Sequence, residues 1–266
     1  MLEGRGDSSA IAATPHPSNA ILPYALGWAS VIALGIVVEA MVRLDILSSY
    51  IIPPPLDILL SLGRVITEEE IPSRLIMTAL EVLAAGTLMS VVGIPLGILL
   101  FESKVLRAAY LNWVAALASA PQIFLYPLFL VAFGRSMATI IAIGFLAGLP
   151  PIVLKTVEAL SSVKPVLVNV GNSMGMTGPQ MFTHVLIPAS LPTIFTGVRL
   201  GLVFAQINVV GVEYLINYGG LGPLITHLAE RYDLPGTYAA VLFVILISIV
   251  FFIVLEMIER WARSYS

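Results

Sequence analysis

Residues 169–188 read Asn-Val-Gly-Asn-Ser-Met-Gly-Met-Thr-Gly-Pro-Gln-Met-Phe-Thr-His-Val-Leu-Ile-Pro and form a short, mildly polar segment between two long apolar blocks. Gly175 is followed by nine residues and then by an apolar-x-apolar-Pro ending, which Val185, Ile187 and Pro188 supply. The spacing of these residues, together with the apolar blocks on either side, decides how the rest of the chain is interpreted.

The composition is that of an integral membrane protein. The chain is 58% hydrophobic and 11% charged, with a mean hydropathy of +0.98, whereas soluble domains carry roughly 25% charged residues. A soluble protein this apolar could not cover its own surface. Cysteine is absent, which excludes disulfides, thiolate metal sites and cysteine nucleophiles. The net charge of −3 gives no indication of a nucleic-acid partner, and we expect none.

Six apolar blocks are long enough to span a bilayer, which takes about 20 residues each. They lie near 23–43, 75–101, 105–133, 136–160, 191–216 and 237–260. Their length and lack of regular alternation favour helices over barrel strands. We therefore predict an all-α polytopic membrane protein with about six transmembrane helices, a flexible tail over residues 1–22 and one membrane domain over 23–266.

Prolines mark two irregular places. Pro121 and Pro127 predict that the block at 105–133 is a broken helix, since each proline removes a backbone donor. The prolines at 53–55 predict an extended entry into a short amphipathic helix that lies on the membrane surface. The acidic residues at 68–70 end that helix, and we expect them to form a solvated patch.

Four landmarks occur in a fixed order along the chain. They are Glu39 with Ile-Pro-Pro-Pro at 52–55, Gly-Ile-Pro-Leu-Gly at 93–97, the prolines at 121 and 127 before Phe-Gly at 133–134, and Leu-Ile-Pro-Ala-Ser-Leu-Pro at 186–192 with Thr-Gly-Val-Arg-Leu-Gly at 196–201. With the segment at 169–188, they resemble the permease subunits of type I ATP-binding-cassette (ABC) importers, in the nitrate/sulfonate/taurine branch. The resemblance covers about residues 28–260. It implies the type I permease fold with cytoplasmic coupling helices.

Three positions depart from the pattern of that branch. Its Glu-Ala-Ala triplet reads Asn169-Val170-Gly171 here, the arginine early in its second helix is Glu81, and a tryptophan of its fifth helix is Gln206. At the triplet, a polar contact would have to come from Asn169. The changes at Glu81 and Gln206 suggest an unusual substrate, or a divergent copy that pairs with a more typical permease.

The resemblance implies that a coupling loop at about 163–190 docks on a separate ATPase. It predicts two short helices over 163–177 and 178–188, with Phe182, Val185 and Leu186 as an apolar knob that enters a cleft of the ATPase. The coupling residues are then Asn169, Gly171, Gly175, Gly178, Phe182, His184 and Pro188. The chain has no Gly-x4-Gly-Lys-Ser/Thr phosphate loop. We therefore expect no cofactor and no catalysis in this chain, with ATP bound by the partner.

Polar side chains inside the apolar blocks are candidates for the translocation path, because ionisable groups in a membrane are costly. To this path we assign Glu81, Gln122, Gln206, Asn208 and Glu213. Two alternatives stay open, since Glu81 could pair with Arg74 and Glu213 could brace the glycine loop at 219–220. For Arg199 we expect a structural role or a bond to the coupling loop. The stripe of small residues at 197, 201 and 205 favours close packing within the chain over a dimer seam.

The resemblance also implies the partners and the location. We expect ABC ATPase subunits, a second permease chain that is identical or homologous, a periplasmic or lipid-anchored solute-binding protein, and the plasma (inner) membrane of a prokaryote. The cargo would be a small solute, with an anion such as nitrate, a sulfonate, taurine or bicarbonate as the first expectation. The same branch also includes permeases for thiamine precursors and riboflavin.

Two other classes of function compete with this interpretation. A self-contained secondary transporter driven by an ion gradient would use Glu81 and Glu213 as carriers, but six helices without an inverted repeat would be small for one. A membrane enzyme would need a histidine cluster, an acid pair or an activated serine, and none stands out. The histidines at 16, 184 and 227 lie far apart and predict no metal site.

Overall fold

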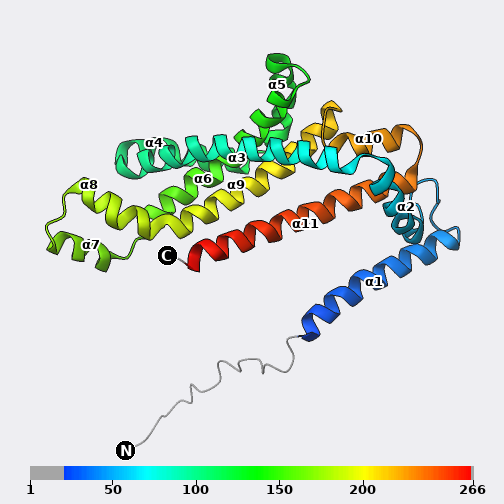
Figure 1. The fold of residues 1–266 in the computed structure, drawn as a ribbon, viewed down its shortest axis with the longest axis horizontal. Coiled ribbons are helices and arrows are strands. Elements are labelled where there is room, and N and C mark those ends of the chain that lie inside the picture. The colour runs from blue at the N-terminus through cyan, green and yellow to red at the C-terminus, as the bar shows by residue number, and fades with distance from the viewer. Residues whose placement is uncertain (1–20, 265–266) are drawn as a thin grey trace, which may run out of the picture. The chain divides into compact units, whose positions relative to one another are not determined.

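The computed structural model describes residues 21–264, and every element in that part of the chain is helical (Figure 1). The all-α prediction is therefore confirmed for these residues. The predicted tail falls almost wholly on residues 1–20, which lie outside the described residues, so the tail stays a prediction. The chain divides into two compact units, one through Ile58 and the other from Leu59 onward.

In the first unit, Glu39 connects α1 (Ile21–Arg43) to the start of α2 (Pro55–Glu68). One carboxylate oxygen accepts a hydrogen bond from Arg43 Nε at 2.6 Å, and the other accepts one from the backbone N–H of Leu56 at 3.0 Å. The prolines at 53–55 carry no N–H, so Leu56 offers the first backbone donor of α2. Glu39 therefore caps the helix that the prolines begin, which explains why these residues occur together.

In the second unit, the predicted acidic patch at the end of α2 is solvated at Glu68 and Glu70, which are exposed, but not at Glu69. Glu69 is only 8% exposed, and its carboxylate pairs with Arg231 at 2.9 Å. Arg74 adds a hydrogen bond of 2.9 Å from its Nε to the Glu69 carbonyl oxygen. The sequence-based prediction is wrong for Glu69, because Arg231, which is distant in sequence, pairs with its carboxylate.

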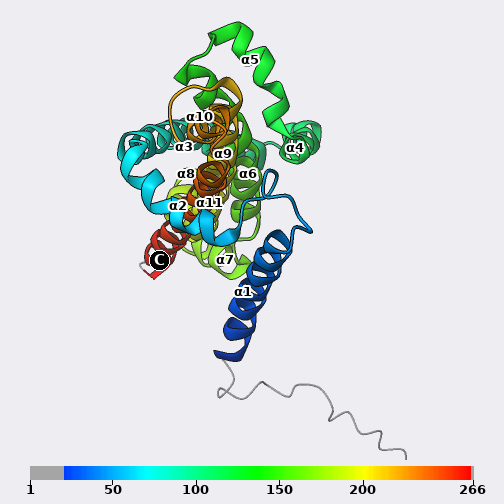
Figure 2. The same cartoon turned by 90° about the vertical axis from the view of Figure 1, so that its right-hand side faces the viewer.

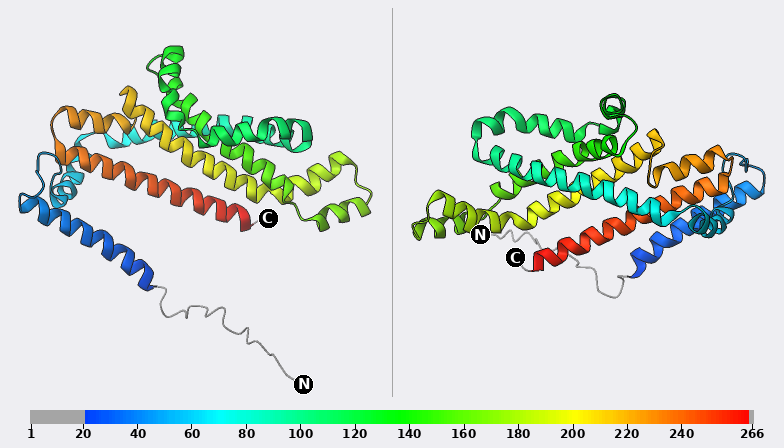
Figure 3. Two further views of the ribbon diagram at one scale, coloured as in Figure 1. Left: turned by 180° about the vertical axis from the view of Figure 1, so that it is seen from behind. Right: turned by 45° about the horizontal axis from the view of Figure 1, so that its top comes forward.

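Three long helices form the centre of the second unit: α3 (Ile71–Glu102), α6 (Met137–Ser161) and α9 (Ile187–Ile216). They run side by side in Figures 1 and 3. A Cβ on Gly148 would lie 2.7 Å from the backbone oxygen of Gly201, and a Cβ on Gly201 would lie 2.8 Å from that of Gly148. The backbones of α6 and α9 therefore touch directly, and the predicted packing of the 197–205 stripe within the chain is confirmed.

Two further helices complete this bundle. α10 (Gly222–Glu230) follows the turn after α9, and α11 (Leu234–Ser264) returns alongside α9. Arg199 of α9 pairs with Glu259 of α11 at 2.7 Å and lies over the ring of Phe252 at 5.4 Å. Arg199 thus joins two helices, which is a structural role, and its recorded ion pair is with α11 rather than with the loop before α9.

The apolar block at 105–133 is bent far more sharply than a proline kink. α4 (Lys104–Ser119) and the run formed by the 3-10 turn η2 (Gln122–Leu125) and α5 (Tyr126–Phe133) meet at 92°. Figure 2 shows α4 nearly end-on while α5 crosses its direction. Pro121 lies at the corner, whereas Pro127 lies in the first turn of α5. The prediction of a break is correct at Pro121 and wrong at Pro127, because a proline in a first helical turn removes no needed donor.

Five helical runs in the described part of the chain are long and apolar enough to cross a membrane, and the bent pair brings the number to as many as six. The five runs are Ala25–Arg43, Ile71–Glu102, Met137–Ser161, Gly178–Ile216 and Leu234–Arg260. The prediction of about six membrane segments is therefore confirmed by length and composition.

Candidate functional site

The segment at 163–190 forms one short helix and one long one. α7 (Pro165–Ser173) is separate, but α8 (Gly178–Met181) continues through a π-helical turn, η3 (Phe182–Leu186), directly into α9. The predicted second short helix over 178–188 is therefore wrong as a separate element. It is the first part of a helical run that extends from Gly178 to Ile216. Figure 3 shows α7 and α8 projecting together at one end of the bundle.

The π-helical turn follows from a proline. The N–H of Ile187 bonds to the carbonyl oxygen of Phe182, five residues back, instead of four. Pro188 has no N–H to bond to the residue four positions before it, so nothing in this turn enforces regular α-helical spacing. Turns of this kind are rare and often occur at functional sites. Pro188 thus explains how the helix crosses from the loop into the bundle without a break.

Glycines shape the turn between α7 and α8. Gly175 has a φ of +70°, a conformation that costs other residues about 1–2 kcal/mol. Gly171 is buried, and a Cβ there would lie 2.6 Å from the terminal methyl of Met181. The side chain of Gln180 closes the start of α8 by accepting a hydrogen bond of 2.8 Å from the backbone N–H of Thr177. Gly175 is therefore required by its backbone conformation, and Gly171 lets the side chain of Met181 pack closely against α7, whereas Gly178 is exposed and has open space around it.

The residues of the predicted apolar knob are partly covered by the chain itself. Phe182, Val185 and Leu186 are all half-buried. Val185 lines a pocket of about 520 Å³ together with residues of α7, and Leu186 lines another beside α7. The exposed apolar side chains of this loop belong instead to α7 and the turn after it, namely Val166, Leu167, Val170 and Met174. Sequence reasoning passed over this face, although its 166-167-170-174 spacing is helical and could have revealed it.

The remaining coupling candidates are exposed. Asn169 lies on α7 next to the Val170 face, and its carbonyl oxygen accepts a hydrogen bond from Ser173 Oγ at 2.9 Å. His184 is exposed on the π-helical turn, with its Nδ1 2.9 Å from Thr183 Oγ1 and 3.1 Å from the Gln180 carbonyl oxygen. The structure brings Gly171, His184 and Pro188 together around the 520 Å³ pocket.

The acidic candidates lie at the opposite end of the bundle. Glu213 is fully buried, and its Oε1 accepts from Thr78 Oγ1 at 2.7 Å while its Oε2 accepts from the Gly222 N–H at 2.8 Å. Thr78 in turn accepts from the N–H of Leu221 at 2.9 Å. Glu213 therefore ties α3 and α9 to the Gly-Leu-Gly turn at 220–222. Thr78 was missed, although a threonine three residues before Glu81 in an apolar helix is a recognisable signal.

Glu81 is also fully buried, with its carboxyl group against that of Glu213. The alternative pairing of Glu81 with Arg74 is wrong, because the Arg74 guanidinium points to the Glu69 carbonyl and lies 3.4 Å from His227 Nδ1. The structure thus places two carboxyl groups together between α3 and α9.

The three amide candidates are buried and bonded within the chain. Gln122 donates to the Leu117 carbonyl across the corner of the bent pair, and Asn208 donates to the Phe204 carbonyl of its own helix at 2.9 Å. Gln206 donates to Ser248 Oγ at 3.0 Å, which joins α9 to α11, and it lines a pocket of about 140 Å³. The five residues assigned to a path therefore do not converge on one cavity in this conformation.

An ion pair holds the turn between α10 and α11 to α2, near the pair formed by Arg231 and Glu69. Arg64 of α2 pairs with Asp233, which also accepts a hydrogen bond of 3.0 Å from the N–H of Gly236. Burial acts to raise the pKa of Asp233, but the bonds from Arg64 and Gly236 outweigh it and hold that pKa below its ordinary value. The same hydrogen bond raises the pKa of Arg64. Among residues 21–264, no three metal-ligating side chains gather in one place.

Comparisons with known proteins agree with a membrane protein built from these helices. The family described as "Binding-protein-dependent transport system inner membrane component" matches residues 89–264. The osmoprotectant import permease protein OsmW of Salmonella typhimurium is 36% identical over 176 residues, which is 64% of this chain and 81% of that protein. The formylaminopyrimidine transport permease protein ThiX of Halalkalibacterium halodurans is 29% identical over 213 residues, 79% of this chain and 84% of that protein.

One more relative and two solved structures are also similar to this chain. The nitrate import permease protein NrtB of Synechocystis is 32% identical over 133 residues, 50% of this chain and 48% of that protein. A chain of the inward-facing methionine ABC transporter MetNI superposes with a TM-score of 0.60 at 20% identity, covering 71% of this chain and 94% of its own. A chain of an amino acid ABC transporter with histidines gives 0.61 at 18% identity, with 75% and 97% covered. These structures show the same fold.

Proposed function

The chain belongs to the family of binding-protein-dependent transport system inner membrane components, and from that premise we propose that its 169–188 loop couples a separate ATPase to solute movement. The chain is a multi-pass permease subunit of an ABC importer. In our proposal it forms half of a translocation path with a second permease chain in the plasma membrane of a prokaryote. ABC ATPase subunits bind the ATP, and a solute-binding protein delivers the cargo.

One observation supports the coupling role above the others. The helical run from Gly178 to Ile216 is continuous, so the loop and a central membrane helix are one mechanical element. α9 packs backbone to backbone on α6 through Gly148 and Gly201. A push on the loop would therefore tilt the central helices, and rigid-body tilting of this kind is a known route to alternating access.

We propose the exposed face of α7 together with the π-helical turn as the surface that meets the ATPase. Val170 and Met174 are 52% and 71% exposed, and they lie beside Asn169. His184 is exposed on the turn that follows. Apolar side chains flanked by polar ones on an end of the bundle are typical of a protein interface. The proposed coupling residues thus extend the initial set by the α7 face.

The identity of the transported solute is a separate part of the proposal. The relatives are named for an osmoprotectant, formylaminopyrimidine and nitrate, so membership in the nitrate/sulfonate/taurine branch is itself proposed. A small anion remains our expectation from the sequence. Two basic residues of the central helices are already paired, Arg199 with Glu259 and Lys155 with Glu158. The binding protein, rather than a basic site in this chain, would then select an anionic cargo.

The experiment purifies the tagged chain in mild detergent, identifies the proteins that accompany it by mass spectrometry and measures ATP hydrolysis. We expect a stoichiometric subunit with a Walker A motif. Val170→Asp should remove that subunit, because a charge would be buried in the contact. Tyr232→Asp changes a side chain that is 91% exposed in the turn after α10 and serves as the matched control. A chain that stays alone and moves solute in vesicles without ATP would contradict the proposal and favour a gradient-driven transporter.

A further inference from the structure

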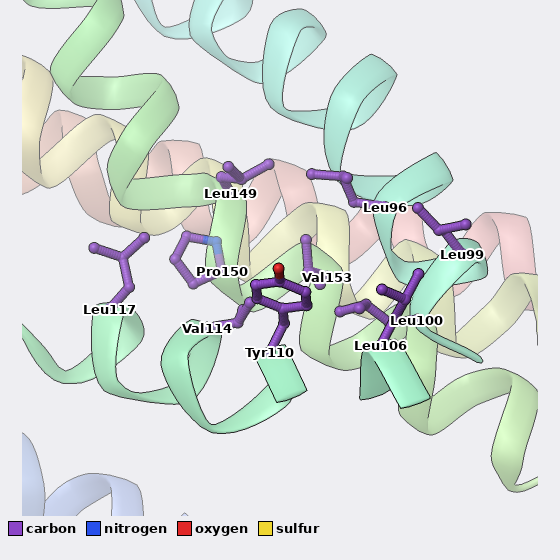
Figure 4. Close-up of a pocket in the computed structure, with 10 residues that line it drawn as sticks. All are labelled: Leu96, Leu99, Leu100, Leu106, Tyr110, Val114, Leu117, Leu149, Pro150 and Val153. Atoms are coloured by element: carbon purple, nitrogen blue, oxygen red, sulfur yellow. The ribbon is translucent and has the colours of Figure 1, made fainter. Parts of the chain in front are cut away.

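A pocket of about 300 Å³ lies between α3, α4 and α6, apart from the coupling loop and from the buried carboxyl groups. Eight of its ten lining residues are leucine or valine, and the other two are Tyr110 and Pro150. Figure 4 shows Tyr110 reaching from α4 into the middle of these side chains. The lining belongs to the membrane-spanning helices α3 and α6 and to the first half of the bent pair.

The pocket is open to the surface of the bundle. Leu96 and Leu99 of α3 are 40% and 48% exposed, and Tyr110 of α4 is 55% exposed. Water does not fill a space lined by leucine and valine, because it finds too few hydrogen-bond partners there. In a bilayer the apolar molecules that can reach the pocket are lipids, whose hydrocarbon chains are as apolar as its lining. Packing and headgroup contacts, rather than the hydrophobic effect, then decide which lipid stays.

Basic residues lie at one end of this pocket, where α3 turns into α4. Lys104 is exposed and begins α4, two residues before Leu106 of the lining. Arg107 is fixed by hydrogen bonds from its Nε and Nη2 to the Leu100 and Phe101 carbonyl oxygens, at 3.3 and 3.1 Å, and its guanidinium lies over the Phe101 ring. Glu102 is the acidic residue of the same turn, so the turn keeps a net positive charge.

From this arrangement we propose that the pocket binds one acyl chain of an anionic phospholipid, with the phosphate headgroup at Lys104 and Arg107. The apolar lining accepts the chain and the two cations hold the headgroup, a combination found where basic pockets between membrane helices bind lipid. The bound chain fills the space between α4 and α6. This site is independent of the solute that the importer carries.

The test measures lipid retained by the full chain in native mass spectrometry, after detergent washing and after adding back phosphatidylglycerol or phosphatidylcholine. We expect one phosphatidylglycerol per chain. Val114→Phe fills the pocket from α4 and should abolish retention of both lipids. Val105→Phe adds the same ring on the same helix at a side chain that is 78% exposed and outside the lining, and it should retain phosphatidylglycerol like the unmodified chain.

Lys104→Gln tests the headgroup contact without disturbing the lining. It should lower the preference for phosphatidylglycerol over phosphatidylcholine by about fivefold, the effect of one surface cation. Thermal unfolding of each variant shows that it is folded. The proposal is overturned if the unmodified chain retains no lipid, if Val114→Phe retains as much as Val105→Phe, or if a protein segment in the assembled importer shields the lining from a photoactivatable acyl chain.

Discussion

Gly220 illustrates how one residue depends on its neighbours. A Cβ at this position would lie 2.0 Å from Glu213 Oε1 and 2.1 Å from Thr78 Oγ1, inside the hydrogen bond that joins them. Gly220→Ala must therefore separate two buried polar groups, which costs about 1–3 kcal/mol. We expect the thermal midpoint in detergent to fall by several degrees. Gly63→Ala has open space and should leave the midpoint unchanged or raise it slightly, and equal midpoints for the two variants would contradict the assignment.

Asp233, in the turn between α10 and α11, gives the stability of the chain a defined pH dependence. Its pKa is lower in the folded chain than in the unfolded one, so its stabilising contribution is complete above about pH 4, the ordinary aspartate value. The contribution is lost as the pH falls through the folded pKa. Unfolding followed between pH 6 and pH 2.5 should show this loss in the unmodified chain. Asp233→Asn should be less stable at pH 6 and lose less on acidification, and parallel curves would show that the pairing with Arg64 has no such effect.

At the scale of elements, the proposed coupling depends on the π-helical turn. Pro188→Ala supplies an N–H that can restore regular α-helical spacing. The π-helical turn holds one residue more than an α-helical turn, so its conversion would rotate α8 about the helix axis by roughly 100°, the angle of one residue. Met181 would then leave Gly171. We expect ATP-driven uptake in reconstituted vesicles to fall about fivefold, within the range that single residues contribute to coupling. Pro179→Ala is the matched control, because a proline in the first turn of α8 replaces no needed donor.

The sequence predicts the elements well where one local cause is enough. The apolar blocks mark the membrane helices by length alone, and the prolines at 53–55 mark the start of α2 because they fix the entry and remove donors. It fails where two causes compete. Pro127 and Pro188 look like helix breakers. Pro127 lies in the first turn of α5 and Pro188 follows the π-helical turn, and at both places the missing backbone donor does not interrupt the helix.

The candidate site is predicted less completely than the fold. Gly175 is identified by spacing and Gly171 by the resemblance to the family's triplet, and the structure shows the local geometry of each. The contacts of Glu213 with Thr78, and of Arg199 with Glu259, depend on helix pairs that are far apart in sequence. No local pattern contains such register, which is why the pairing of Glu81 with Arg74 was wrong. The α7 face is different, because its helical spacing is visible in the sequence and was passed over.

At the scale of the whole molecule, the proposed tilting of the bundle depends on the direct contact between α6 and α9. Gly201→Val would drive side-chain atoms into the backbone of Gly148, where even a Cβ lies 2.8 Å away. Overpacking of this kind costs about 1–3 kcal/mol or more. We expect a lower yield of monodisperse protein in size-exclusion chromatography and an earlier unfolding midpoint. Gly35→Val, on α1 with open space around it, is the control, and similar losses in both variants would argue against the close contact.

The continuity of the loop with α9 makes the central claim a mechanical one: the end of the bundle that carries α7 and the π-helical turn is where the ATPase acts. The chain has no cysteine, so a single introduced thiol can be labelled without background. The most direct measurement places that thiol by His184→Cys and treats the assembled importer with a short bifunctional cross-linker. The account predicts an adduct with the ATPase subunit, and none from Tyr232→Cys in the turn after α10. No adduct from His184→Cys, or an equal one from Tyr232→Cys, would contradict it.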